Sequence, residues 1–202
     1  MKVFFVKRKS QSLLETIVAI SILIVGVVSM LGMVSAMVVA RTTAEYETVA
    51  TNLAREGIEV VRNVRDTNWM NNVAFDTGLF TQSRYCLSFE PSNTDGFHPN
   101  GWRLGTATLN STLTVMKYTA GPYSGFYTQV CTGETAKWTV AATIYTRTLT
   151  IQDICSDGSV KAAGTSCTAG TSVGALITSL VNWTERSRPH SISLVEKIYD
   201  WR

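Results

Sequence analysis

The residue types that most often carry catalysis or bind metals are sparse in this chain and lie far apart. His98 and His190 are its two histidines, each stands next to a proline, and neither belongs to a metal-binding spacing such as H-x-x-x-H. Asp153, Asp157 and Gly158 could contribute to a calcium loop, but they lack the alternating oxygen ligands of such loops, so we expect a tight turn there. We expect no enzyme active site, no metal site and no cofactor.

Four cysteines could form disulfide bonds: Cys86, Cys131, Cys155 and Cys167. None shows the C-x-x-C spacing of zinc sites or redox motifs, and an even number in an exported region favours disulfides. Four thiols allow three pairings. We favour Cys155 with Cys167, which would close a Gly- and Ser-rich loop between two strands, and Cys86 with Cys131, which would bridge separate strands. A reducing compartment would instead leave all four as thiols.

Glu15 is a third group of interest, because it stands just before a long uncharged segment. Residues 17–40 include no Asp, Glu, Lys, Arg, His, Asn, Gln or Pro. As a helix this run would span about 36 Å, enough to cross a hydrocarbon layer of about 30 Å. A carboxylate entering a bilayer costs about 2.5 to 3.5 kcal/mol at its centre and less near the interface, so we expect Glu15 to have a function and a cationic partner.

The charges at the two ends of the apolar run differ. Lys7, Arg8 and Lys9 precede it and a lone Arg41 follows it, so the positive-inside rule places the N-terminus in the cytoplasm and the rest outside. The formal net charge is +3, but the first ten residues contribute four of the 18 basic residues. Without them the balance is 14 minus 15, or −1, so the basic pI does not indicate nucleic-acid binding.

Residues 7–19, KRKSQSLLETIVA, resemble the N-terminus of type IV prepilins. That family has a short basic leader, a small residue, a new N-terminal residue, and a glutamate at mature position five. The resemblance implies cleavage between Ser10 and Gln11, N-methylation of Gln11, and an assembly role for Glu15. The chain departs from the family pattern twice, with Ser10 where glycine is usual and Gln11 where phenylalanine is usual.

Physical chemistry supports an assembly role for Glu15. Cleavage creates a cationic α-amino group at Gln11, and in a helical stack of subunits this group can meet the Glu15 carboxylate of a neighbouring subunit. Deleting one member of a buried ion pair typically costs about 3 to 5 kcal/mol, because the remaining charge is left in a dry medium. Such a pair would set the axial register of the subunits.

The helical pattern continues beyond the apolar run, since no proline occurs before Pro91. Apolar residues at spacings of three or four predict an amphipathic continuation that packs on the downstream strands. The stripe consists of Tyr46, Val49, Leu53, Gly57, Val60 and Val64, broadened by Ala50, Ala54 and Val61. The charged residues between them are expected to form a solvated face, with Arg55–Glu59 and Arg62–Asp66 as weak ion pairs. One helix is therefore predicted from about residue 12 to about residue 68.

From about Trp69 onward, short runs rich in Thr, Val, Ile and Tyr alternate with turn residues, which predicts β-strands. The candidate strands are residues 85–89, 125–131, 138–154, 175–183 and 191–196. In the third strand the apolar phase flips between Ile144 and Tyr145, which indicates a bulge or a strand covered on both faces. Residues 90–124 are expected to form a long loop with little regular structure, and residues 185–190 the loop of a hairpin.

The sequence thus predicts an α+β, pilin-like fold, in which a long N-terminal α-helix packs on an antiparallel β-sheet head. The expected parts are a cleaved basic leader (residues 1–10), a transmembrane helix (11–40), its amphipathic continuation (41–69) and a β-rich head (70–202). The head would lie outside the cytoplasm.

The resemblance extends to the layout of minor pilins of the PilV type. It implies a non-catalytic subunit, a minor pilin or pseudopilin, of a type IV pilus or a type II secretion pseudopilus. The implied location is the inner membrane for the precursor, then the extracytoplasmic filament. The implied partners are other pilin or pseudopilin subunits, a prepilin peptidase, an inner-membrane assembly platform and, before assembly, membrane lipid.

Two other interpretations fit the same N-terminus. A secretory signal could be cleaved after a small residue such as Ala36 or Ala40, although signal h-regions usually run only about 7 to 15 residues. A plain anchor would stay uncleaved. Either would leave a membrane-anchored or secreted β-rich domain that binds a sugar or acts as a hydrolase. The five tryptophans could stack on sugars, but in a small head we expect them to build core.

Overall fold

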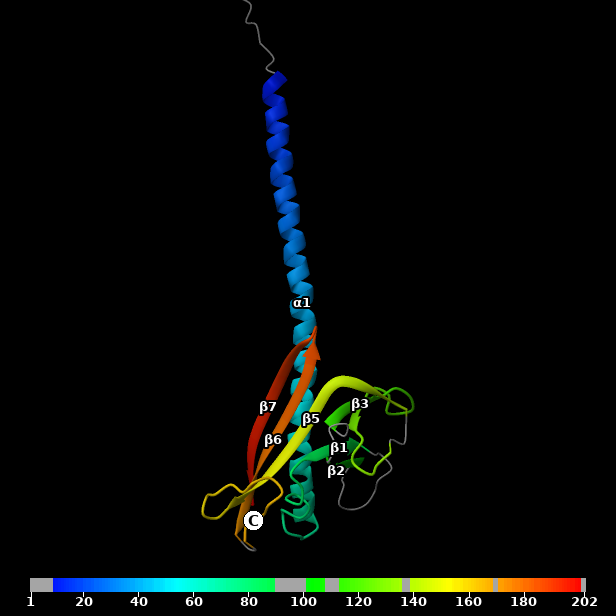
Figure 1. The fold of residues 1–202 in the computed structure, drawn as a ribbon, viewed down its shortest axis with the longest axis vertical. Coiled ribbons are helices and arrows are strands. Elements are labelled where there is room, and N and C mark those ends of the chain that lie inside the picture. Colours follow the sequence, from blue (N-terminus) through cyan, green and yellow to red (C-terminus); the bar gives the residue numbers. More distant parts are fainter. Residues whose placement is uncertain (1–8, 90–100, 108–112, 136–138, 169–170, 201–202) are drawn as a thin grey trace, which may run out of the picture. The chain divides into compact units, whose positions relative to one another are not determined.

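The predicted α+β class is confirmed by the computed structural model, in which a long N-terminal helix packs on an antiparallel sheet (Figure 1). The structure describes residues 9–89, 101–107, 113–135, 139–168 and 171–200, with side chains from residue 13 onward. The chain divides into two compact units, Met1–Tyr46 and Glu47–Arg202. Helix α1, Lys9–Met70, contributes to both units and includes the predicted helical range.

The described residues of the second unit contain a seven-stranded antiparallel sheet. Its strands are β1 (Tyr85–Phe89), β2 (Trp102–Thr106), β3 (Thr114–Tyr118), β4 (Tyr127–Gln129), β5 (Val140–Cys155), β6 (Ser172–Glu185) and β7 (Arg188–Tyr199). Strand β5 is central, because it pairs with β6 along one edge and with β1 and β3 along the other. Figure 1 shows the long strands β5, β6 and β7 beside the C-terminal part of α1.

The core of this unit lies between α1 and the inner face of the sheet. Most of the predicted helical stripe is buried there, including Leu53, Ala54 and Val61. The sheet contributes fully buried Leu149 and Ile177. Complete burial of such an aliphatic side chain contributes about 1.5 to 3 kcal/mol, so this contact is the main source of stability for the helix in residues 47–70.

A fully buried arginine lies within this core. Arg147 points inward from β5, and its Nη1 donates to Glu56 Oε1 at 2.7 Å and to the carbonyl oxygen of Leu53 at 3.2 Å. Its Nε donates to Gln129 Oε1 at 3.0 Å. Gln129 in turn donates to the carbonyl oxygens of Leu113 and Arg147, both at 2.9 Å. One guanidinium therefore connects α1 to β4 and β5.

Helix and sheet approach each other closely at Gly57. A Cβ atom added to Gly57 would lie 2.7 Å from Ser179 Oγ on β6 and 3.4 Å from Leu149 Cδ1. Ser179 is fully buried. A glycine on the apolar stripe therefore allows the helix backbone to lie against β6, although glycine costs about 1 kcal/mol relative to alanine in a helix interior.

The charged face of α1 differs from the prediction. Glu56 is half-buried by its contact with Arg147, and Arg62 pairs with Glu59 and with Glu196 of β7. The hydrogen bond to Glu196 raises the pKa of the Arg62 guanidinium above its ordinary value. The expected solvated face therefore supplies two charged groups that bind the sheet, because the strands wrap beyond the apolar stripe.

Two strands occupy the region predicted to be a loop. Strands β2 and β3 fall within residues 90–124, and β2 pairs along its whole length with β1 in the register Tyr85↔Thr106 to Phe89↔Trp102. All five residues of β2 are half-buried, so the strand shows no alternation of buried and exposed positions. The strand conformation of β2 therefore depends on its pairing with β1. The local sequence does not reveal this pairing.

The predicted hairpin is present, but its loop is shorter than expected. Strands β6 and β7 are joined by Arg186 and Ser187 alone, whose φ angles are +47° and +66°. Pro189 and His190 therefore belong to β7. Positive φ at both central residues is typical of a type I′ turn, whose twist matches that of the paired strands.

The sequence left two explanations for the change of phase in β5, a bulge or a strand covered on both faces, and the structure shows the first, a bulge in the pairing with β3. The β3–β5 register shifts between Thr114↔Thr146 and Met116↔Ala142, so three residues of β5 lie opposite the single residue Val115. Thr143 Oγ1 donates to the Val115 carbonyl oxygen at 2.6 Å and accepts from the Tyr145 amide at 3.3 Å. The side chain of Thr143 thus takes the place of lost backbone pairing.

Replacing Arg147 with alanine should lower the free energy of unfolding of this unit by about 3 to 5 kcal/mol, because Glu56 and Gln129 would lose a buried partner. The matched control is Arg103→Ala, which removes a partly exposed pair with Glu134 and should cost less than about 1 kcal/mol. Urea unfolding of the full chain in detergent micelles, followed by tryptophan fluorescence, measures both. Equal losses would contradict a central role for Arg147.

Candidate functional site

The N-terminal part of α1 has no apolar partner within its own unit. Every described side chain of residues 13–40 is exposed, including large ones on all sides of the helix such as Leu23, Ile24 and Val25. The helix is long and apolar enough to cross a membrane. These are the properties of a single-pass anchor or a signal sequence, and an exposed apolar surface of this extent requires lipid or other helices to cover it.

The hydroxyl groups of this segment are satisfied by the helix itself. Each one donates to a backbone carbonyl oxygen three or four residues earlier: Thr16 to Leu13 at 2.9 Å, Ser21 to Ile17 at 2.8 Å, Ser29 to Val25 at 2.7 Å, and Ser35 to Leu31 at 3.0 Å. Unsatisfied polar groups are costly in hydrocarbon. With its hydroxyls bonded internally, the segment presents an essentially apolar exterior.

Glu15 is the only ionisable side chain among the described residues 13–40, and it is exposed. This segment has no lysine, arginine or histidine that could neutralise it. A cation that offsets its charge must therefore come from the chain N-terminal to Leu13 or from another molecule. Ser10 and Gln11 lie in the first turn of α1, but their side chains, and the whole of residues 1–8, fall outside the described part.

The structure joins Cys86 to Cys131 and Cys155 to Cys167, the pairing that the sequence favours. The Cα atoms are 5.8 Å apart in the first bridge and 5.7 Å apart in the second. The first bridge connects β1 to the segment after β4, and the second closes the loop between β5 and β6. Gly105 of β2 lies against the first bridge, because a Cβ added there would be 2.6 Å from Cys131 Sγ.

Asp153 anchors the second loop from inside. It is fully buried, and its two carboxylate oxygens accept from the Cys167 amide at 2.7 Å and the Ser172 hydroxyl at 2.6 Å. Both oxygens are thus occupied by donors of the chain. The carboxylate orders the disulfide loop, which assigns Asp153 a structural role.

The expected tight turn is present within this loop. The Gly158 amide donates to the Cys155 carbonyl oxygen at 2.9 Å, and the Ser159 amide donates to Asp157 Oδ1 at 2.8 Å. The hydroxyl and amide of Ser159 lower the pKa of the Asp157 carboxyl below its ordinary value. Within the described ranges, no three His, Cys, Asp or Glu side chains gather as metal ligands would.

The described histidine and tryptophans lie in the second compact unit. His190 stacks on Trp183, with ring centroids 5.3 Å apart, and His98 lies outside the described residues. Trp69 and Trp183 are buried, as expected of core residues, and Trp102 is half-buried. Arg65 lies over the ring of Trp69 at 4.6 Å. Trp138 and Trp201 also lie outside the described residues.

Comparisons with protein families, with curated proteins and with solved structures find no match to this chain. Function must therefore be argued from the apolar segment, Glu15 and the head themselves.

Sequence reasoning did not single out Arg147, the residue that joins α1 to the sheet. Its position in β5 contained a signal, because Tyr145, Arg147, Leu149 and Ile151 share one phase of the strand and that phase is the buried one. An arginine in an otherwise apolar phase implies a buried acceptor. Glu56 is that acceptor.

Removing the disulfides should destabilise the head to different extents. Serine at both Cys155 and Cys167 opens a loop with a sequence separation of 12 and should cost about 3 kcal/mol. Serine at both Cys86 and Cys131 opens one with a separation of 45 and should cost about 4 kcal/mol, since the longer loop restricts the unfolded chain more. Urea unfolding under non-reducing conditions measures both variants. If a reductant leaves the unmodified chain as stable as before, the bridges contribute nothing.

Proposed function

We propose that this chain is a non-catalytic structural subunit, a minor pilin or pseudopilin, of a type IV pilus or a type II secretion pseudopilus. The observation that carries the proposal is Glu15, a carboxylate with no cationic side chain in the described residues 13–40, at the start of an all-round apolar helix that continues into the core of an antiparallel head. A simple anchor needs the apolar residues but has no use for the carboxylate.

The apolar surface of residues 13–40 accounts for two successive locations. In the precursor the segment lies in the inner membrane, where lipid covers it and Lys7, Arg8 and Lys9 hold the N-terminus in the cytoplasm. In the filament the same surface is covered by the helices of other subunits. The free-energy cost of leaving lipid is then small, because apolar contact with lipid is exchanged for apolar contact with protein.

The carboxylate supplies the register of assembly. A prepilin peptidase that cleaves between Ser10 and Gln11 creates an α-amino cation four residues before Glu15 in the sequence. That cation can pair with Glu15 of the adjacent subunit in a medium that contains no other ionisable side chain of the segment. The pair would form at one axial offset only, so mismatched stacks leave two buried charges unpaired.

The other proposed partners act on this segment. A prepilin peptidase processes it at the cytoplasmic face of the membrane, and an inner-membrane assembly platform moves the processed subunit from lipid into the filament. The head, with its two disulfides, then lies outside the cytoplasm, where an oxidising environment keeps the bridges formed.

Mass spectrometry of the chain isolated from its native cell tests the processing step. We expect a mature chain that starts at Gln11, with or without one added methyl group. An intact Met1 would indicate a plain anchor, and a start near Arg41 would indicate a secreted domain. Either result would overturn the proposal.

Replacing Glu15 with valine or glutamine should leave the amount of subunit in the membrane unchanged but lower its incorporation into filaments. A loss of about 3 kcal/mol corresponds to a decrease on the order of a hundredfold. Immunoblots of the sheared filament fraction and of the membrane fraction measure the two amounts. The matched control, Glu45→Gln, changes an exposed glutamate of the same helix beyond the apolar run and should assemble normally. Normal incorporation of both Glu15 variants would refute the assembly role.

A further inference from the structure

The sheet of the head divides at one end of its central strand pair. Strands β5 and β6 pair from Cys155↔Ser172 to Thr146↔Asn182, and both strands continue beyond this last pair. In the same register Tyr145 would next lie opposite Trp183, and Ile144 opposite Thr184, but neither pair forms. Residues 140–142 of β5 pair with β3, and residues 183–185 of β6 pair with β7, so each strand keeps its partner on the other edge.

The bulge in β5 explains the division. It falls at residues 143–145, between the last pair with β6 and the resumed pairing with β3. Bulges bend the strand that carries them and increase its twist. Beyond the bulge, β5 therefore follows β3 and departs from β6.

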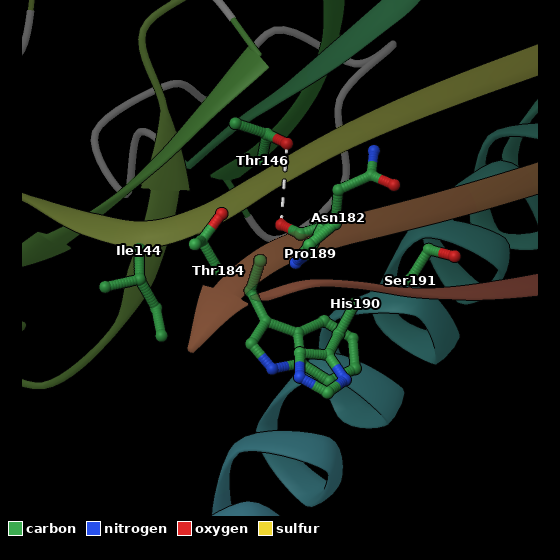
Figure 2. A pocket seen from close by; sticks show the side chains of 8 residues that line it. Ile144, Thr146, Asn182, Thr184, Pro189, His190 and Ser191 are labelled. Atoms are coloured by element: carbon green, nitrogen blue, oxygen red, sulfur yellow. Dashed lines mark hydrogen bonds between the residues drawn. The ribbon is translucent and has the colours of Figure 1, made fainter. Parts of the chain in front are cut away.

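A cleft of about 480 Å³ lies at this division, and we call it the fork cleft. Its lining residues are Ile144, Thr146, Asn182, Trp183, Thr184, Pro189, His190 and Ser191. None of them is Asp, Glu, Lys or Arg. Figure 2 shows Ile144 and His190 on one side of the strands and the hydroxyl groups of Thr146 and Thr184 on the other.

The backbone of Thr184 points into the fork cleft. In a hairpin closed by a two-residue turn, the flanking pair, here Glu185↔Arg188, exchanges hydrogen bonds, and bonded and non-bonded pairs then alternate along the strands. Thr184↔Pro189 is therefore a non-bonded pair, which suits Pro189 because it has no N–H to donate. The N–H and C=O of Thr184 face away from β7, toward the position that β5 has left.

We propose that the fork cleft binds an extended, uncharged segment of a partner protein by strand addition between β5 and β6. The N–H and C=O of Thr184 pair with the backbone of that segment. Its alternate side chains meet two surfaces: apolar ones lie toward Ile144 and the Trp183–His190 stack, and small hydroxyl-bearing ones lie toward Thr146 and Thr184. This inference does not depend on the proposed filament.

The burial of Trp183 favours a peptide over a sugar in this cleft. Sugars bind against an open aromatic face, but Trp183 is only 5% exposed, with His190 stacked on it and Tyr145 6.3 Å away, centroid to centroid. The unpaired strand edge of Thr184, by contrast, is a ready template for another strand. The absence of charged lining residues selects against charged segments, because a buried charge there would have no partner.

The test uses the full chain in detergent micelles and fluorescein-labelled octapeptides. Each peptide has a lysine at both ends. Between them, threonine alternates with one apolar residue, which is valine, leucine or phenylalanine. We expect at least one peptide to bind, as measured by fluorescence polarisation, and to slow hydrogen exchange in the segment that contains Thr184. Thr184→Pro removes the N–H that faces the cleft and should weaken binding at least tenfold. Ile144→Lys, which places a charge at the cleft, should also weaken it.

Ser193→Pro is the matched control for Thr184→Pro. By the same alternation, Ser193 directs its N–H toward the outer edge of β7, away from the fork cleft, so this variant should bind as the unmodified chain does. Unfolding midpoints of all three variants establish that each is folded. The proposal is overturned if no peptide binds, if both proline variants lose binding equally, or if maltotriose and not the peptides protects the Thr184 segment.

Discussion

A single helix has to meet two different surroundings, and the rest of the structure follows from that requirement. Residues 13–40 are apolar on all sides, whereas residues 47–70 are apolar on one side and charged on the other. The first pattern suits a medium without water, and the second suits one face of a sheet. The sheet must therefore offer a matching apolar face, which Leu149, Ile151 and Ile177 provide.

Apolar contact alone would leave the position of the helix on the sheet poorly defined, because aliphatic side chains tolerate small slides. The polar contacts remove this freedom. Arg147 can bond Glu56 and the Leu53 carbonyl oxygen in only one alignment, and Gly57 admits Ser179 at only one point along the helix. Arg62 and Glu196 add a third contact at the margin. Buried polar networks of this kind favour one arrangement over its near neighbours.

Local patterns in the sequence predicted the features that depend on local periodicity. The helical stripe shows as a period of 3.6, strand β1 as a run of strand-forming residues between turn residues, and the irregularity in β5 as a change of phase. Strands β2 and β3 show no such pattern. In β2, Gly105 and Arg103 interrupt the run of strand-forming residues, and the residues of β1 that lie opposite them are of very different type. The turn at Arg186 and Ser187 lacks the glycine or asparagine that usually marks positive φ, so its loop was predicted to be too long.

The candidate site shows the same division. Glu15 could be recognised because a carboxylate beside an uncharged run is conspicuous in one dimension. Arg147 and Glu56 lie 91 positions apart, and only the fold brings them together. The cysteines fall between these cases, since their number indicated bridges and the loop between two strands favoured one pairing. The fork cleft depends on three strands and has no signature in any one segment.

The internal hydrogen bonds of the hydroxyl groups in residues 16–35 have a second consequence, besides making the segment compatible with a membrane. A serine that relied on a neighbouring molecule for its hydrogen bond would tie the helix to that neighbour, and each change of surroundings would first require that bond to break. Here the donors stay with the carbonyl oxygens of their own turn, so the same bonds persist in lipid, in detergent or against protein. A helix bonded in this way can pass from one medium to another without breaking a hydroxyl hydrogen bond, and apart from Glu15 only shape and dispersion then decide its contacts.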